Sequence, residues 1–196
     1  MIARVLVACE FSGIVRDAFA ALGHDAWSCD LLPTEVAGQH IVGDVLKVLH
    51  DGWDVMIAHP PCTHLAVSGA RHFAKKRESG EQDAALRFVA DLLGAPIQMI
   101  ALENPVSIIS SHIRRPDQVI QPWMFGHCES KATCLWLKNL PLLLPERIEY
   151  ERRPVVHRMP PGPNRWRNRS RTYSGIAKAM AEQWHTTIQR RTTEAA

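Results

Sequence analysis

Residues 54–69 read Asp-Val-Met-Ile-Ala-His-Pro-Pro-Cys-Thr-His-Leu-Ala-Val-Ser-Gly, and the predicted fold is built outward from this stretch. Its apolar start, Val55–Ala58, predicts a buried strand. The following His59-Pro60-Pro61 predicts a rigid turn, because each proline fixes its own φ angle. Cys62 therefore follows the carboxyl end of a strand, the edge at which open α/β sheets carry their sites. The sequence thus predicts a positioned thiol.

A βαβ unit is predicted at the start of the chain. The run Arg4–Ala8 predicts a strand, and Ile14–Leu22 has the spacing of an amphipathic helix. His24–Cys29 predicts a second strand that closes on Asp30, where nucleotide-binding α/β folds place an acid that accepts hydrogen bonds from ribose. The turn Cys9–Gly13 has one glycine rather than GxGxxG, so we expect a cofactor without a pyrophosphate.

Strands and helices continue to alternate along the chain. Further strands are expected at His40–Asp44, Asp54–Ala58, Ile97–Leu102, Gln118–Trp123 and Thr133–Leu137, with a helical turn at Val45–Leu49 and helices at Glu81–Leu93 and Gly175–Trp184. This alternation predicts an α/β fold with a doubly wound, mostly parallel sheet and a site at its carboxyl edge. We expect one catalytic domain over residues 1–190, with a Pro/Arg-rich insertion at 139–171 and a frayed tail at 191–196.

Composition narrows the class of protein. The length of 196 residues fits one domain, and no apolar run approaches the ~20 residues of a membrane helix. Five cysteines without regular spacing do not form a disulfide framework, so we expect a reducing cytoplasm, with Cys9, Cys29 and Cys134 as small core residues. Residues 147–171 carry eight arginines and two glutamates, which suits either a phosphate-bearing partner or a solvated surface strip.

Four chemically useful side chains fall at successive predicted strand ends: Asp30, Asp44, Cys62 and Glu103. The first two could bind a nucleoside, although either could instead cap a helix. A thiolate is an effective nucleophile toward an electron-poor ring carbon. A carboxyl group opposite it can protonate or hydrogen-bond a ring nitrogen. A Glu103 that only caps a following helix is the structural alternative.

Four motifs, in order, resemble those of the DNA cytosine-5 methyltransferases. Residues 60–69, Pro-Pro-Cys-Thr-His-Leu-Ala-Val-Ser-Gly, resemble the nucleophile motif of that family, and residues 103–106, Glu-Asn-Pro-Val, resemble its Glu-Asn-Val motif. Phe11-Ser12-Gly13 resembles the glycine turn of its cofactor pocket, and residues 173–181, Tyr-Ser-Gly-Ile-Ala-Lys-Ala-Met-Ala, resemble its closing motif. The resemblance covers residues 1–110 well, 170–185 fairly and the middle poorly.

The resemblance implies a Rossmann-like methyltransferase that uses S-adenosyl-L-methionine. Cys62 would attack C6 of cytosine, Glu103 would hold and protonate N3, and C5 would receive the methyl group. The cofactor-binding residues would be Phe11, Ser12, Gly13, Asp30, Asp44, Pro60 and Gly175. In this arrangement Asp30 binds the ribose, Asp44 binds the adenine amino group and Phe11 packs on the adenine.

The same resemblance implies a substrate of DNA, of unknown strandedness, or a cytosine nucleotide. The substrate-binding residues would be Ser68, Arg71, Asn104, Lys131, Arg165 and Arg167, and the loop 68–80 would close over the base. The middle region is too short for the usual target recognition domain. We therefore expect a compact, possibly phage-type enzyme whose recognition element is missing, reduced to the arginine strip, or supplied by a second copy or a separate partner. Its location would be the cytoplasm of a bacterium or a phage-infected host.

Two alternative functions remain open from the sequence. An enzyme that methylates an exocyclic amine (N4 or N6) would carry an aromatic ring after the two prolines, where this chain has Cys62. A non-catalytic nucleic-acid binder could keep the same fold. His59, Cys62 and His64, with His127-Cys128, lack the spacing of a zinc site, so no metal is expected. Trp166, flanked by arginines, could stack on a base.

Overall fold

The computed structural model describes residues 2–146, 148, 149 and 151–194. Seven strands form one sheet in the order β3-β2-β1-β4-β5-β7-β6. The strands are β1 (Arg4–Ala8), β2 (Asp25–Asp30), β3 (His40–Val42), β4 (Val55–Ala58), β5 (Met99–Pro105), β6 (Gln118–Ile120) and β7 (Thr133–Lys138). Neighbours from β3 to β5 pair in parallel, whereas β7 is antiparallel to both β5 and β6. The predicted doubly wound, mostly parallel α/β sheet is therefore confirmed.

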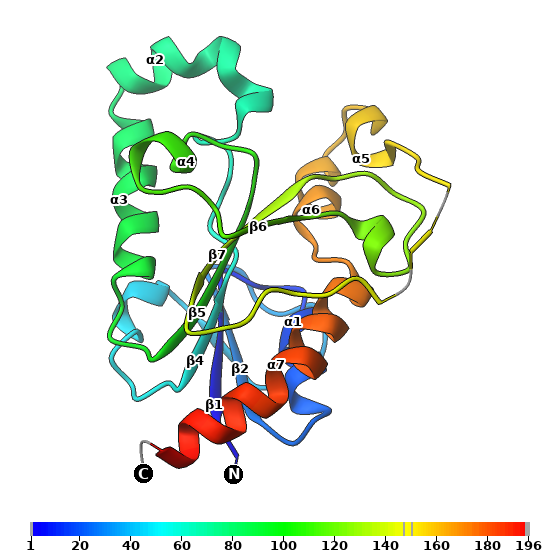
Figure 1. Cartoon of the computed structure of the whole chain (residues 1–196). Coiled ribbons are helices and arrows are strands. Elements are labelled where there is room, and N and C mark those ends of the chain that lie inside the picture. The colour runs from blue at the N-terminus through cyan, green and yellow to red at the C-terminus, as the bar shows by residue number, and fades with distance from the viewer. Residues whose placement is uncertain (1, 147, 150, 195–196) are drawn as a thin grey trace.

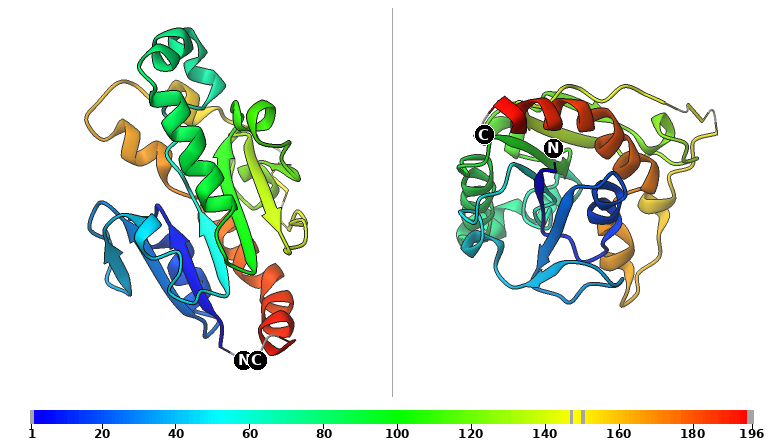
Figure 2. Two further views of the ribbon diagram at one scale, coloured as in Figure 1. Left: turned by 90° about the vertical axis from the view of Figure 1, so that its left-hand side faces the viewer. Right: turned by 90° about the horizontal axis from the view of Figure 1, so that it is seen from below.

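Helices cover both faces of the sheet. The helices are α1 (Ile14–Ala20), α2 (Phe73–Glu78), α3 (Glu81–Leu93), α4 (Ile109–His112), α5 (Val155–Arg158), α6 (Arg165–Ser170) and α7 (Ser174–Glu194), with 3₁₀ turns η1 (Val45–Lys47), η2 (Val67–His72) and η3 (Pro122–Met124). Helices α1 and α7 pack together on one face, and α3 covers the other (Figure 1). Figure 2 shows α3 and α7 on opposite sides of the sheet.

The alternation of side chains along each strand separates the core into two layers. Val5 and Ile57 join the layer beneath α1 and α7, whereas Leu6 and Met56 join the layer beneath α3. All four side chains are fully buried, and burying one such side chain is worth about 1.5–3 kcal/mol. Burial on both faces explains why the strands read as continuous apolar runs.

Several predicted boundaries were wrong. Residues 68–80, predicted to be a mobile loop, are mostly helical, because η2 runs directly into α2. Strand β6 ends at Ile120 rather than Trp123, since Pro122 begins η3. The terminal helix runs from Ser174 to Glu194, so residues 191–194 of the predicted tail are helical; 195 and 196 lie outside the described residues.

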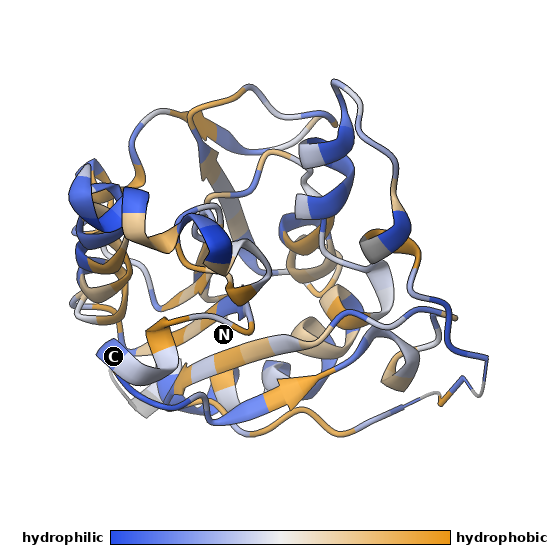
Figure 3. Ribbon diagram, turned by 90° about the horizontal axis from the view of Figure 1, so that it is seen from above, coloured by the Kyte–Doolittle hydropathy of each residue, from blue (hydrophilic) through white to orange (hydrophobic). Residues whose placement is uncertain are grey.

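The Pro/Arg-rich insertion holds two short helices, α5 and α6, that the sequence did not predict. Arg147, the first arginine of this strip, lies outside the described residues. In Figure 1, α2 stands on one side of the upper end of the sheet and α6 on the other. Figure 3 looks down on this end, where hydrophilic turns flank the strands. Within the described ranges, every helix is too short or too polar to cross a bilayer.

Candidate active site

The ends of β4 and β5 bring the predicted reactive groups to one place. Parallel pairing of Ala58 with Leu102 puts His59 beside Glu103, and His59 Nδ1 lies 3.2 Å from Glu103 Oε2. Asn104 Nδ2 donates a 2.9 Å hydrogen bond to the carbonyl oxygen of Pro60. This bond fixes the proline turn against β5, so the segment that presents Cys62 has a defined position.

Cys62 is exposed just beyond this turn. Its carbonyl oxygen accepts hydrogen bonds from the backbone N–H groups of Leu65 and Ala66, at 3.1 and 2.9 Å, which curls the chain after the thiol. Desolvation and the charge of Glu103 raise the pKa of the Cys62 thiol, while Lys131 and Arg169 act in the opposite direction. The thiol is therefore protonated at neutral pH, and it lies within electrostatic reach of Glu103.

Glu103 is largely enclosed, with a side chain that is 14% exposed. Burial by itself would raise its pKa. The hydrogen bond from His59, the positive charge of Lys131 and a hydrogen bond from Thr133 outweigh that effect, so the pKa of Glu103 is lowered. The carboxyl group is consequently ionised in the resting protein.

Three buried polar atoms near the ends of β4 and β5 have no hydrogen-bond partner in the described part of the chain. They are His59 Nε2, Asn104 Oδ1 and Ser107 Oγ. Buried polar atoms are nearly always paired, with protein or with water, because an unmade hydrogen bond costs about 1–3 kcal/mol. This half of the edge therefore has hydrogen-bonding capacity available for a ligand or ordered water.

Glu10 begins the other half of the edge, after β1. Its carboxylate accepts hydrogen bonds from Ser12 Oγ at 3.0 Å and from the N–H groups of Val15 and Arg16 at 2.8 and 3.2 Å. The side chain thus caps the N-terminus of α1, the position at which dinucleotide-binding folds hold a pyrophosphate. A carboxylate there repels phosphate, which agrees with the missing GxGxxG.

The predicted nucleoside acids lie close together at the tips of β2 and β3. Both Asp30 and Asp44 raise the pKa of the Cys9 thiol, after the larger effect of burial. Asp30 Oδ1 accepts from Leu32 N at 2.9 Å, while Asp44 is exposed and caps η1 through Leu46 N at 3.0 Å. A second backbone hydrogen bond, from Leu31, also acts on the Asp30 carboxylate. Cys9 lies at the end of β1 with φ +59°; it is partly buried and packs against the core layer beneath α3, and the other two predicted core thiols, Cys29 and Cys134, are buried.

Helix α6 covers the glycine turn. The Trp166 ring lies 5.8 Å from the ring of Phe11, and the Arg167 guanidinium lies 5.5 Å above the same ring. Glu35, whose N–H donates to Phe11 O at 2.8 Å, pairs with Arg167 at 3.0 Å and with Arg171 at 2.7 Å. The structure therefore places Arg167 and Trp166 against Phe11 of the predicted cofactor turn. Their predicted contact with the base stays a prediction.

The other predicted substrate residues are dispersed. Lys131 lies near Cys62 and donates to Arg169 O at 3.1 Å, whereas Arg165 is tied to Met159 O at 2.9 Å. Ser68 and Arg71 are exposed in η2. The segment between Cys62 and η2 is fastened, since Lys76 Nζ donates to the carbonyl oxygen of Thr63 and Gln82 Nε2 donates to that of His64 at 3.1 Å.

Gly175 packs against the segment after η3. Its N–H donates to His127 Nε2 at 2.9 Å, and a Cβ added there would lie 1.9 Å from Phe125 O. Only glycine allows this approach. His127 was missed as a partner because nothing in the local sequence indicates a contact 48 residues away.

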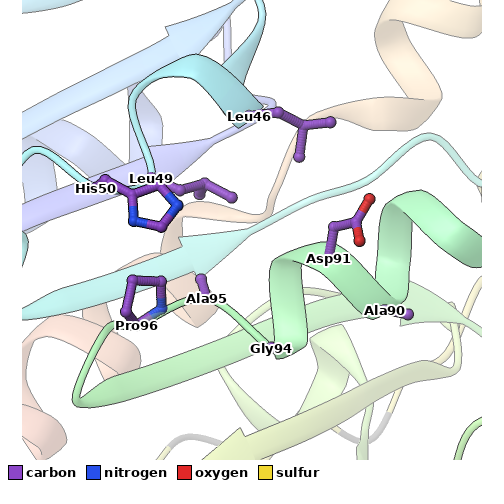
Figure 4. A pocket seen from close by; sticks show the side chains of 8 residues that line it. All are labelled: Leu46, Leu49, His50, Ala90, Asp91, Gly94, Ala95 and Pro96. Carbon is purple, nitrogen blue, oxygen red and sulfur yellow. The ribbon is translucent and has the colours of Figure 1, made fainter.

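A hollow lies elsewhere, between η1 and the end of α3 (Figure 4). It is lined by Leu46, Leu49, His50, Ala90, Asp91, Gly94, Ala95 and Pro96. Asp91 is the one acidic group among them, and none of the predicted site residues contributes. Among the described residues, no three His, Cys, Asp or Glu side chains gather in a way that would hold a metal ion.

Comparison with known proteins identifies the fold. The chain matches no protein-family model and no curated protein sequence. Among solved structures, it is similar to a candidate DNA modification methyltransferase encoded within a prophage of E. coli, with a TM-score of 0.50 and 15% identity. The match covers 75% of this chain and 52% of the other, so this chain corresponds to about half of that protein. The α/β sheet is therefore of the kind found in that protein.

Proposed function

We propose that this protein is an S-adenosyl-L-methionine-dependent DNA methyltransferase that methylates C5 of cytosine through a covalent bond to Cys62. One observation carries the proposal. The exposed thiol of Cys62 and the enclosed, ionised carboxylate of Glu103 follow adjacent parallel strands and lie within electrostatic reach of each other. The fold shared with a candidate DNA modification methyltransferase supports the general class. The thiol favours the cytosine-5 reaction within it.

The chain's own residues have defined tasks in this reaction. Cys62 loses its proton as the sulfur bonds to C6, and the ring electrons move toward N3, which takes up a proton at the Glu103 carboxyl group. When the C5 proton has left, the sulfur–C6 bond breaks and the thiol is regenerated. The bound cofactor supplies an electrophilic methyl group to C5. The low solvent exposure of Glu103 would strengthen its contact with the base, because fewer water dipoles compete.

The first half of the edge fits such a cofactor. Asp30 and Asp44 would accept hydrogen bonds from the hydroxyl and amino groups of a nucleoside, and their negative charge suits a sulfonium cation better than a phosphate. Phe11 and Trp166 offer two aromatic rings at the place where an adenine would lie. The Glu10 carboxylate at the N-terminus of α1 would repel a pyrophosphate. These acidic and aromatic residues thus suit a nucleoside that carries a positive charge.

Basic segments on both sides of the edge suit DNA. Arg71, Lys75 and Arg77 lie in η2 and α2, and Arg152 and Arg158 lie in or near α5; all five are exposed. Their separation across the sheet end would let them contact phosphates on either side of a base (Figure 1). A base in a duplex must leave the stack to reach Cys62. Because the basic side chains would contact phosphates, DNA binding should weaken as the salt concentration rises. A second copy or partner chain could add sequence recognition.

Covalent trapping tests the proposal. DNA that contains 5-fluorocytosine should leave an adduct on the wild-type protein with S-adenosylmethionine, because fluorine at C5 blocks the elimination step. Cys62→Ser should give no adduct. Cys128→Ser is the matched control, since Cys128 is also an exposed thiol but lies outside the site. The adduct should persist in that variant.

The other outcomes separate the rival functions. A wild-type protein that methylates DNA without any adduct would refute the thiol mechanism in favour of methylation of an exocyclic amine. Titration calorimetry with S-adenosylhomocysteine covers the remaining rival. If the folded protein binds DNA but produces no heat with this ligand, the protein is a nucleic-acid binder without a cofactor site.

A further inference from the structure

The proposed reaction needs a proton donor beside Glu103. N3 must gain a proton as the sulfur adds to C6, yet Glu103 is ionised in the resting protein. A carboxylate without a proton can accept a hydrogen bond but cannot donate one. The proton must therefore reach Glu103 from a neighbouring group or from solvent, and Glu103 is only 14% exposed.

His59 is the neighbour placed to supply it. Its Nδ1 is 3.2 Å from Glu103 Oε2, and its side chain is 7% exposed. The backbone at His59 is restrained on both sides, because its N–H donates to Ala8 O at 2.9 Å and two prolines follow. Imidazole is the side chain that gains and loses a proton near neutral pH. The pair can hold one proton in two ways: on the imidazole of His59, with Glu103 ionised, or on the carboxyl group of Glu103, with His59 neutral.

The other groups that face Glu103 do not meet this need. Thr133 gives it a hydrogen bond, but a hydroxyl group does not titrate near neutral pH. Lys131 contributes charge, and its Nζ donates to Arg169 O at 3.1 Å. Cys62 is coupled to Glu103 by charge alone. Within the described residues, His59 is thus the titratable group in hydrogen-bond contact with the carboxylate.

We infer that His59 is a positioning residue that orients Glu103 through Nδ1 and delivers, through Glu103, the proton that cytosine N3 takes up. This inference rests on the proposed function. As the sulfur–C6 bond forms, one proton leaves the Cys62 sulfur for solvent and one passes from the His59–Glu103 pair to N3. As that bond breaks, the C5 proton leaves to solvent, the sulfur regains a proton from solvent, and the N3 proton returns to the pair. The counts of protons and charges balance over the cycle.

The second ring nitrogen completes the arrangement. His59 Nε2 is buried and has no hydrogen-bond partner in the described chain. Since Nδ1 faces Glu103, Nε2 is the ring atom through which a water molecule could restore a proton to the pair.

The test is the rate of adduct formation with 5-fluorocytosine DNA, measured from pH 5.5 to 9 for wild type, His59→Asn and His59→Gln. Asparagine can keep a donor near the position of Nδ1 but cannot carry a transferable proton. We expect His59→Asn to slow trapping about 10–100-fold at pH 7.5 and to move the alkaline limb of the profile to lower pH. Melting temperature and S-adenosylhomocysteine binding should stay near wild-type values.

The outcomes are distinct. A wild-type protein that forms no adduct refutes the proposed function, and the role of His59 with it. If the wild type forms the adduct and a folded His59 variant has the same rate and the same pH profile, only the role of His59 is refuted. Should His59→Asn fail to fold, the His59→Gln profile decides, because glutamine fills more of the space left by the ring.

Discussion

The two halves of the carboxyl edge differ in how their polar side chains are partnered. At the ends of β1, β2 and β3, the carboxylates are bound to the chain's own backbone: Glu10 caps α1, Asp30 accepts from Leu32 and Asp44 caps η1. At the ends of β4 and β5, His59 and Asn104 each keep a buried polar atom that has no hydrogen-bond partner among the described residues. The thiol of Cys62 is exposed beside them.

This difference separates two kinds of polar residue. A carboxylate that closes a helix N-terminus stabilises the fold, because the first N–H groups of a helix otherwise lack partners. A buried atom that the fold leaves unpaired has a cost unless a ligand or water pairs with it. We therefore expect substitutions at the ends of β1, β2 and β3 to affect stability or, at Asp30 and Asp44, cofactor binding. Substitutions at the ends of β4 and β5 should affect the reaction.

The largest effect should come from Glu103→Gln. Glutamine has the same shape and can still bond to His59 and Thr133, but it has no acid to pass a proton to N3. The rate of adduct formation with 5-fluorocytosine DNA should fall by about 10²–10⁴-fold, while the melting temperature stays close to wild type. A Glu103→Gln protein that forms the adduct at the wild-type rate would contradict the assignment of the reaction to the ends of β4 and β5.

A smaller effect, on stability, is expected for Glu10→Gln. One end of the amide would be a donor facing the N–H of Val15 or Arg16, so at least one buried hydrogen bond is lost. The free energy of unfolding, measured in urea, should fall by about 1–3 kcal/mol. The folded fraction should still form the adduct. An equally stable Glu10→Gln protein that cannot be trapped would place Glu10 in the reaction instead.

The smallest effect is expected for Trp166→Ala, which tests where α6 belongs. Loss of one aromatic contact is worth about 0.5–1.5 kcal/mol, so the affinity for S-adenosylhomocysteine should fall about 3–10-fold in titration calorimetry. Val155→Ala, exposed on the neighbouring α5, is the control and should bind normally. If Trp166→Ala weakens DNA binding alone, the ring serves the base, as the sequence first suggested.

Much of the fold could be predicted because its signals are local. Apolar runs gave β1 and β4, and the helical spacing gave α3 with the bounds that the structure has, Glu81–Leu93. The carboxyl edge followed from the alternation of strands and helices, since parallel strands end on the same side. The failures were at 68–80 and in the Pro/Arg-rich segment. There, short helices are stabilised by contacts such as that of Lys76 with Thr63 and that of Arg169 with Val156, rather than by an apolar period.

By itself, the sequence determined the α/β class and the order in which Asp30, Asp44, Cys62 and Glu103 reach the strand ends. Their roles in catalysis and binding stay predictions. Only the tertiary structure decided which distant residues meet: His59 with Glu103, Gly175 with the backbone of Phe125, and Trp166 with Phe11. Periodicity sets which face of an element is buried, because it depends on neighbours a few residues apart. Contacts between distant segments depend on how the packed layers place them, and no local pattern encodes that.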